Sequence, residues 1–142
     1  MKPYSNATLR IGGDGLNPKV CSELLGIIPD KQWRKGEPFM ISPGRMHEKH
    51  SGLWMYETEN RVKSNNPFDP LPHVNHIIQV FSGKKMQFDK IRNDMKNVSV
   101  SIFITLGVPS VTYTLDKQTL ETILAIGVDD MNYTFIGIEN EE

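Results

Sequence analysis

The chain has 142 residues, with 16 lysines and arginines against 17 aspartates and glutamates, for a net charge of −1. This balance excludes the strong basic footprint of a nucleic-acid-binding protein and the acidic surface of a nucleic-acid mimic. The length favours one domain with its own hydrophobic core, and we expect a single domain over residues 1–142.

The clearest local pattern lies near the start of the chain. Polar and apolar residues alternate from Thr8 to Ile11, which predicts a half-buried strand. The glycine-rich segment 12–15 then predicts a turn, and Asn17 with Pro18 fits the start of a helix that Gly26 would end. Pro18 stands where a dinucleotide-binding fingerprint needs its third glycine, so we expect a structural turn rather than a phosphate site.

Periodicity and turn residues predict the remaining elements. Strands are expected over 39–42, 53–58, 98–106, 111–115 and 131–135, and helices over 71–81, 88–95 and 117–126. The segments 30–38, 46–51 and 60–72 are polar or proline-rich and are expected to be irregular. The order β-α-β-β-α-α-β-β-α-β indicates an α+β fold with a mixed or largely antiparallel sheet and helices on one face. A helix that ends at a glycine is expected near both ends of the chain. This echo leaves open a fold built from two ferredoxin-like halves.

Several short motifs carry a family resemblance. They are Ile11-Gly12-Gly13-Asp14, Asn17-Pro18, Leu24-Leu25-Gly26-Ile27-Ile28-Pro29, Lys35-Gly36-Glu37, Gly52-Leu53-Trp54 and Leu124-Ala125-Ile126-Gly127-Val128-Asp129. Together they resemble the bacterial domain of unknown function 4279 family over most of the chain. The resemblance implies a small bacterial α+β protein of unassigned role, and it supplies no catalytic residues.

The four histidines form two pairs, each with a spacing of three residues. His47 and His50 fall in a polar segment, whereas His73 and His76 fall at the start of a predicted helix. Residues three apart on a helix share a face, so either pair could supply two metal ligands, and both pairs together could form one site. Neither pair has the zinc-protease spacing or an acidic partner fixed by spacing, so solvated histidines are favoured over a metal site.

The remaining candidates are a cysteine and a set of aromatic and basic residues. Cys21 lies on the apolar side of its predicted helix, which favours a core thiol over a nucleophile. No hydrolase signature is present, and we expect no cofactor. Arg and Trp anchor many interfaces, and the candidates for partner or ligand contacts are Trp33, Arg34, Lys35, Arg45 and Trp54. Trp33 is the expected surface aromatic, whereas a strand position favours the core for Trp54.

Composition also indicates the compartment. A single cysteine excludes an intramolecular disulfide and fits a reducing environment. The first residues lack the apolar run of a signal peptide, and no stretch approaches the roughly 20 apolar residues that span a bilayer. We therefore expect a cytoplasmic protein, with residues 139–142 as a frayed acidic tail.

These observations favour a small bacterial module that binds another protein, one form of which is an immunity-type neutraliser of a toxin domain. The expected partner is a protein, with no nucleic acid or membrane, and the expected state is a monomer or weak homodimer. The alternative is a small-ligand or metal-binding protein, or an enzyme of unknown reaction. It would use a cleft beside the segment 60–72, with Arg45 or the histidines as polar anchors.

Overall fold

A computed structural model describes residues 2–64, 66–108 and 113–137 of the chain. Within these residues the strands are β1 (Tyr4–Gly13), β2 (Lys31–Trp33), β3 (Pro38–Ser42), β4 (Arg45–Glu48), β5 (Gly52–Glu57), β6 (Val98–Gly107) and β7 (Asp130–Phe135). The helices are α1 (Pro18–Leu25), α2 (Leu71–Phe81), α3 (Lys85–Asp94) and α4 (Lys117–Ile126). The predicted α+β class is confirmed.

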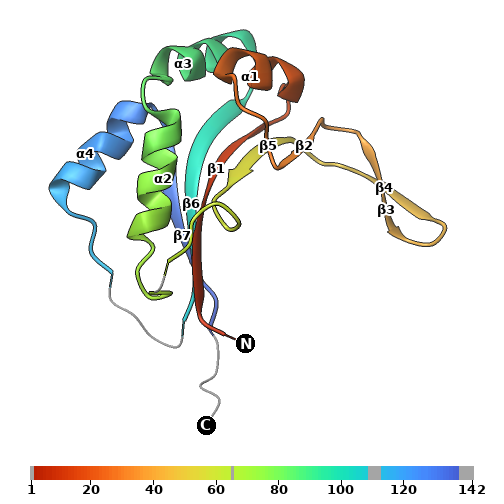
Figure 1. The fold of residues 1–142 in the computed structure, drawn as a ribbon. Helices are drawn as coiled ribbons and strands as arrows, with labels where there is room; N and C mark the ends of the chain where they lie inside the picture. Colours follow the sequence, from red (N-terminus) through yellow and green to blue (C-terminus); the bar gives the residue numbers. More distant parts are fainter. Residues whose placement is uncertain (1, 65, 109–112, 138–142) are drawn as a thin grey trace.

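Five strands form one mixed sheet in the order β2-β5-β1-β6-β7. The two ten-residue strands β1 and β6 pair antiparallel from Tyr4 opposite Gly107 to Gly13 opposite Val98. Only β6 and β7 run parallel, because α4 crosses over between them. Strands β3 and β4 pair separately as a hairpin, the arm (residues 38–48), which stands off from the sheet in Figure 1.

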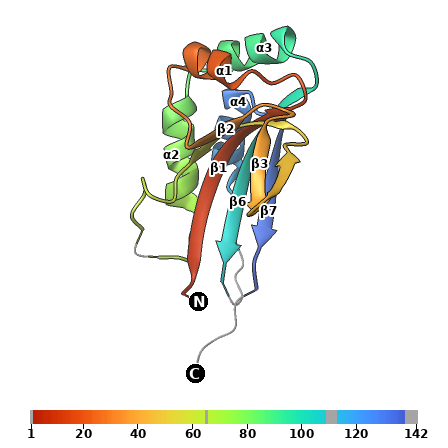
Figure 2. The same cartoon turned by 90° about the vertical axis from the view of Figure 1, so that its right-hand side faces the viewer.

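All four helices pack on one face of the sheet. Alternate residues of β1, namely Ala7, Leu9 and Ile11, are fully buried against that layer. Helix side chains such as Phe81 of α2 and Phe88 of α3 complete a single core with them. Figure 2 looks onto the other face, where the long strands lie in front of the helices and the arm projects toward the reader. Among the residues that the structure describes, no helix covers that face (Figure 2).

The capping residues predicted for the first and last helices are present in the structure. The Asn17 side chain accepts a hydrogen bond from the Val20 N–H at 3.5 Å, and Pro18 opens the helix. Asp116 caps α4 through the Thr119 N–H at 2.7 Å. Gly26 ends α1 with a φ of 68°, the left-handed conformation that a glycine adopts without strain.

Two segments expected to be irregular contain strands. Residues 30–38 include β2, and residues 46–51 include the end of β4. Both strands are short and largely exposed, so neither carries the alternation of burial from which a strand is predicted. The strand expected over 111–115 begins outside the described residues, and its remainder, Tyr113 to Leu115, is irregular. The acidic tail 139–142 also lies outside the described residues.

Candidate functional site

The uncovered face of the sheet is the candidate site, and Arg10 stands near its middle. Arg10 pairs with Met55 of β5 on one side and with Ser101 of β6 on the other. Because neighbouring residues of a strand point to opposite faces, Leu9 and Ile11 enter the core while Arg10 faces away from the helices. The position of Arg10 is therefore held by hydrogen-bonded strands on both sides.

Two hollows meet at Arg10 on this face. The first, of about 530 Å³, lies along β1 and β6, and the second, of about 500 Å³, extends toward β2 and the arm. Both include Arg10, Ser51, Gly52 and Leu53. The first hollow is also lined by Gly12, Gly13, Asp14, Asn97, Ser99, Ser101 and Phe103, and the second by Lys31, Trp33, Lys49, His50 and Met55. They are parts of one concave surface.

The Arg10 guanidinium has few partners of its own. It lies 4.2 Å from the centroid of the Phe103 ring, and its Nη2 donates to the Met55 sulfur at 3.7 Å. Its Nε is buried without a hydrogen-bond partner in the described structure. Among the residues that the structure describes, Arg10 forms no ion pair. A sulfur is a weak acceptor, so this cation retains free donors for an anion.

Aromatic rings and further cations surround the second hollow. The Lys49 ammonium lies 3.7 Å from the Trp33 ring centroid and 4.1 Å from that of Phe39 on the arm. The indole N–H of Trp33 donates to the Ser51 carbonyl at 3.0 Å, which fixes the ring. Such cation–ring contacts orient a lysine without neutralising it. We call this surface the basic face, and its members are Arg10, Lys31, Trp33, Lys49 and Phe103.

Two carboxylates lie at the borders of the basic face. Glu57 is 3.5 Å from the Lys31 ammonium, and Asp14 is 3.5 Å from that of Lys35. Lys31, Lys35 and Asp14 are exposed and Glu57 is partly exposed, and ion pairs in such contact with water contribute little. Within the described chain, Arg10 and Lys49 therefore stand as cations without a carboxylate partner.

The structure distributes the predicted contact residues over several surfaces. Trp33 belongs to the basic face. Arg34 lines a separate hollow of about 340 Å³ that Trp33 also borders. Lys35 pairs with Asp14, and Arg45 is exposed on the arm, away from both hollows. Arg10, Lys49 and Phe103 were missed by sequence reasoning, although the alternation around Arg10 and Phe103 already places them opposite the apolar positions.

Trp54 cannot act as a contact residue, because its side chain is 0% exposed. Its position in β5 turns it toward the helices, where its ring meets Phe81 edge-on at a centroid distance of 6.2 Å. The indole N–H donates to the Ser22 hydroxyl of α1 at 2.9 Å. Trp54 is therefore a core residue, as its strand position favours, and it is removed from the candidates for partner or ligand contacts.

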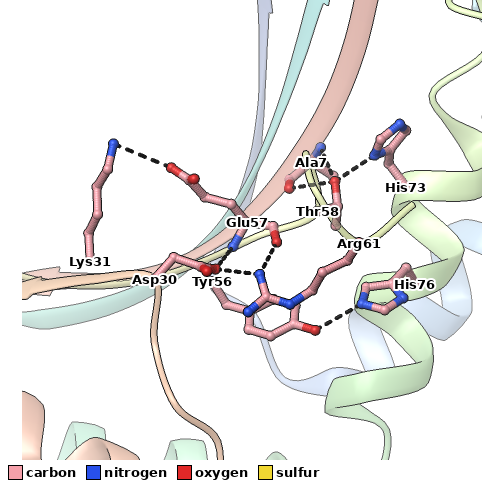
Figure 3. A network of polar contacts seen from close by, with 9 residues as sticks. All are labelled: Ala7, Asp30, Lys31, Tyr56, Glu57, Thr58, Arg61, His73 and His76. Carbon is pink, nitrogen blue, oxygen red and sulfur yellow. Dashed lines mark hydrogen bonds and ion pairs between the residues drawn. The ribbon is translucent and has the colours of Figure 1, made fainter. Parts of the chain in front are cut away.

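The second histidine pair joins α2 to β5, as Figure 3 shows. His73 Nδ1 lies 2.6 Å from the Thr58 hydroxyl, and His76 Nε2 lies 2.8 Å from the Tyr56 hydroxyl. Thr58 also accepts from the Ala7 N–H of β1 at 2.9 Å. Burial lowers the pKa of both histidines, with a smaller contribution from the neighbouring His76 and Arg61 respectively. Both imidazoles are therefore neutral structural partners at pH 7.

The two histidine pairs do not form one site. His50 lines the second hollow on the uncovered face, whereas His73 and His76 contact β5 from the helix side. In the ranges 2–64, 66–108 and 113–137, no group of three or more His, Cys, Asp or Glu side chains could hold a metal ion. The sheet itself separates the pairs.

An ion pair beside the histidines joins Asp30, which directly precedes β2, to Arg61, which follows β5. Arg61 donates to the Asp30 carboxylate at 2.7 Å and to the Glu57 carbonyl at 2.6 Å, and its guanidinium lies 4.2 Å from the Tyr56 ring centroid (Figure 3). Asp30 also accepts from the Glu57 N–H at 2.7 Å. Although partial burial opposes ionisation, these bonds lower the pKa of Asp30. The donors and acceptors of this network therefore satisfy one another, and the network joins Asp30, just before β2, to Glu57 at the end of β5.

Two further predictions concern Cys21 and a cleft beside the segment 60–72. Cys21 is buried, and burial raises the pKa of its thiol to about 12, which agrees with a core residue and opposes a nucleophile. Beside the segment 60–72 lies a hollow of about 210 Å³, bordered by Ser5, Glu59 and His73. Arg45 does not reach it.

The architecture defines an α+β protein whose mixed sheet is covered by helices on one face and presents a basic concave surface on the other. The sequence profile of the family described as Domain of unknown function (DUF4279) matches residues 2–129, and the chain belongs to that family. The predicted resemblance is thereby confirmed. Comparisons with curated proteins and with solved structures found no match. Within the described residues, no helix has the length and apolar character to cross a membrane.

Proposed function

We propose that this protein is a non-catalytic module of the bacterial cytoplasm that binds another protein through its basic face. The observation that carries the proposal is the Arg10 guanidinium, which lies without a carboxylate partner where two hollows meet. An arginine with free donors on an uncovered sheet is a ready anchor for an incoming surface.

The composition of the basic face supports a protein partner. Arginine and tryptophan are enriched where protein interfaces are anchored, and Arg10 and Trp33 lie on the same surface here. A ten-residue strand such as β1 spans roughly 33 Å, so the uncovered sheet is long enough for an interface of standard size. The arm extends this surface through Phe39, whose ring contacts Lys49.

The distribution of perturbed groups supports binding rather than catalysis. Active sites place groups with displaced pKa values in their pockets. Cys21, His73 and His76, whose pKa values are displaced, lie outside both hollows of the basic face, and His73 borders only the smaller hollow beside the segment 60–72. His76 is instead engaged by the Tyr56 hydroxyl of β5, and His73 by the hydroxyl of Thr58, which directly follows β5.

The particular form that we favour is an immunity-type neutraliser, which would cover a toxin domain with the basic face and the arm. Its support is the small size of the chain and the open sheet surface. A partner identified as a toxin domain, whose activity is inhibited on binding, would decide this form of the proposal.

The experiment is affinity capture from the native host, followed by reconstitution with the purified partner. We compare the wild type with Trp33→Ala and Lys49→Ala on the basic face, and with Met86→Ala on α3 as control. Met86 is 81% exposed and lies away from both hollows, so its loss should change nothing. A 1:1 complex that the two face variants weaken at least tenfold is expected. Equal binding by the face variants would contradict the proposal.

A small-ligand protein is the second candidate, and the size of the hollows favours it. Volumes of about 530 and 500 Å³ lie within the usual range of small-molecule pockets. A metabolite that raises the melting temperature of the wild type but not of Arg10→Gln, together with an empty capture experiment, would select this function instead.

A further inference from the structure

We propose that the partner presents an acidic segment to the basic face, and that one of its aspartate or glutamate carboxylates binds the Arg10 guanidinium. This inference rests on the proposed function and names the chemistry that the same surface recognises. It follows from the donors of Arg10, from the ring beneath it and from the charges around the two hollows.

The donors of Arg10 are the first argument. A guanidinium carries five N–H donors in one plane, and the described structure gives them a single acceptor, the Met55 sulfur at 3.7 Å. The Nε is withdrawn from water and has no partner. In the described structure Nη1 also has no partner but is not withdrawn from water, so Nη1 and the weakly engaged Nη2 are the donors that an incoming carboxylate can reach.

The position of the guanidinium is the second argument. The Arg10 Cζ lies 4.2 Å from the centroid of the Phe103 ring, a cation–π contact that holds the guanidinium over β6 without accepting a hydrogen bond from it. β1 is paired on both sides, so the backbone of Arg10 is held by two strands. This pre-organised fork matches the two oxygens of a carboxylate.

The surroundings add two features to the expected ligand. Lys31 and Lys49 line the second hollow and favour additional acidic residues next to the first. Trp33 and Leu53 line the same hollow and favour a neighbouring apolar side chain. The expected segment therefore carries several carboxylates interspersed with at least one aromatic or aliphatic residue.

The same surroundings disfavour a nucleic acid strand. Asp14 lines the first hollow and Glu57 lies beside Lys31, so a continuous row of phosphates would meet two carboxylates. The net charge of −1 also gives no long-range attraction for a polyanion. An acidic peptide can place apolar or neutral residues at those positions, because its charges need not be evenly spaced.

The test is a selection of random twelve-residue peptides, displayed on phage, against the immobilised wild type with counter-selection against Arg10→Gln. The enriched peptides are made with a fluorescent label, and their dissociation constants are measured by anisotropy. We expect enrichment in Asp and Glu, at least tenfold weaker binding to Arg10→Gln, and a similar loss when the acidic residues of a peptide are changed to Asn and Gln. Arg10→Lys should bind the acidic peptides severalfold more weakly than the wild type. Lysine keeps the positive charge but lacks the planar pair of donors that bind both oxygens of a carboxylate.

Met86→Ala should bind like the wild type, and thermal melts establish that each variant is folded before its affinity is measured. Peptides without acidic enrichment, equal binding to a folded Arg10→Gln, or no enriched peptide would overturn the inference. Tighter binding of a labelled twelve-nucleotide polythymidine, lost in Arg10→Gln, would assign the site to nucleic acid and overturn it too. A captured partner that needs Trp33 but not Arg10 would overturn only this inference and leave the proposed function standing.

Discussion

The guanidinium of Arg10 lies over the ring of Phe103, 4.2 Å from its centroid, on the face of the sheet opposite the four described helices. Arg10 belongs to β1 and Phe103 to β6, and the antiparallel register sets them diagonally across the pair. The ring holds the cation in place without neutralising it. The pairing of β1 with β6 therefore fixes the position of Arg10 on the surface that we propose as the binding site.

Replacing Phe103 by leucine should separate positioning from folding. Leucine keeps most of the apolar contact of this half-buried residue, so unfolding in urea should show a loss of only about 1 kcal/mol. Without the ring, Arg10 should lose its fixed orientation, and acidic peptides should bind severalfold more weakly. An affinity loss no larger than that of Met86→Ala would show that the ring does not position Arg10.

The two tryptophans should respond differently to truncation. Trp54→Ala should destabilise the protein by about 3–5 kcal/mol, because it opens a cavity in the core and leaves the Ser22 hydroxyl without its donor. Trp33→Ala should cost about 1 kcal/mol, since the half-buried ring chiefly contacts Lys49 and the Ser51 carbonyl. Urea denaturation of both variants checks the contrast, and similar losses would refute the assignment of Trp54 to the core.

Thr58 should be a stability determinant despite lying beyond the end of β5. Its buried hydroxyl bonds the Ala7 backbone of β1 and His73 of α2, so Thr58→Val leaves two buried groups without partners at nearly constant volume. We expect a loss of about 2–4 kcal/mol in the free energy of unfolding. Thr134→Val, at an exposed position of β7, is the matched control and should stay within about 0.5 kcal/mol.

Acidification should weaken the contact between α2 and β5. Burial lowers the pKa of His73 and His76 in the folded protein, so the unfolded chain binds more protons once the pH falls below about 6.5. The free energy of unfolding should therefore decrease as the pH falls from 7.5 to 5.5.

The control for this pH dependence is a double variant, His73→Gln with His76→Gln, measured by urea denaturation at each pH. It is less stable overall, but its stability should change less over the same pH range, because the two titrating groups are gone. His47→Gln, on the exposed arm, should keep the wild-type slope. If the free energy of unfolding changed equally with pH in the wild type and in the double variant, His73 and His76 would not be the cause of the pH dependence.

Local chemistry explains which parts of the fold could be predicted. The Asn17 cap and the Gly26 C-cap depend on atoms within four residues, and both are present as expected. The alternation of buried residues in β1 and β6 reflects the two-residue period of a strand with one covered face. By contrast, Lys31 and Arg45 lie in short, exposed strands, where no burial pattern distinguishes a strand from a loop.

Taken alone, the sequence determined the α+β class, the family, the long strands and the capped helices, because each depends on interactions between near neighbours or on short motifs. The tertiary structure decided which side chains share a surface. Arg10 meets Phe103 and Met55 only through the pairing of β1 with β6 and β5, and Lys49 meets Trp33 only because the chain returns from the arm beside β2. Such contacts join residues that are distant in the sequence, and register between strands, which short-range patterns do not encode, brings them together.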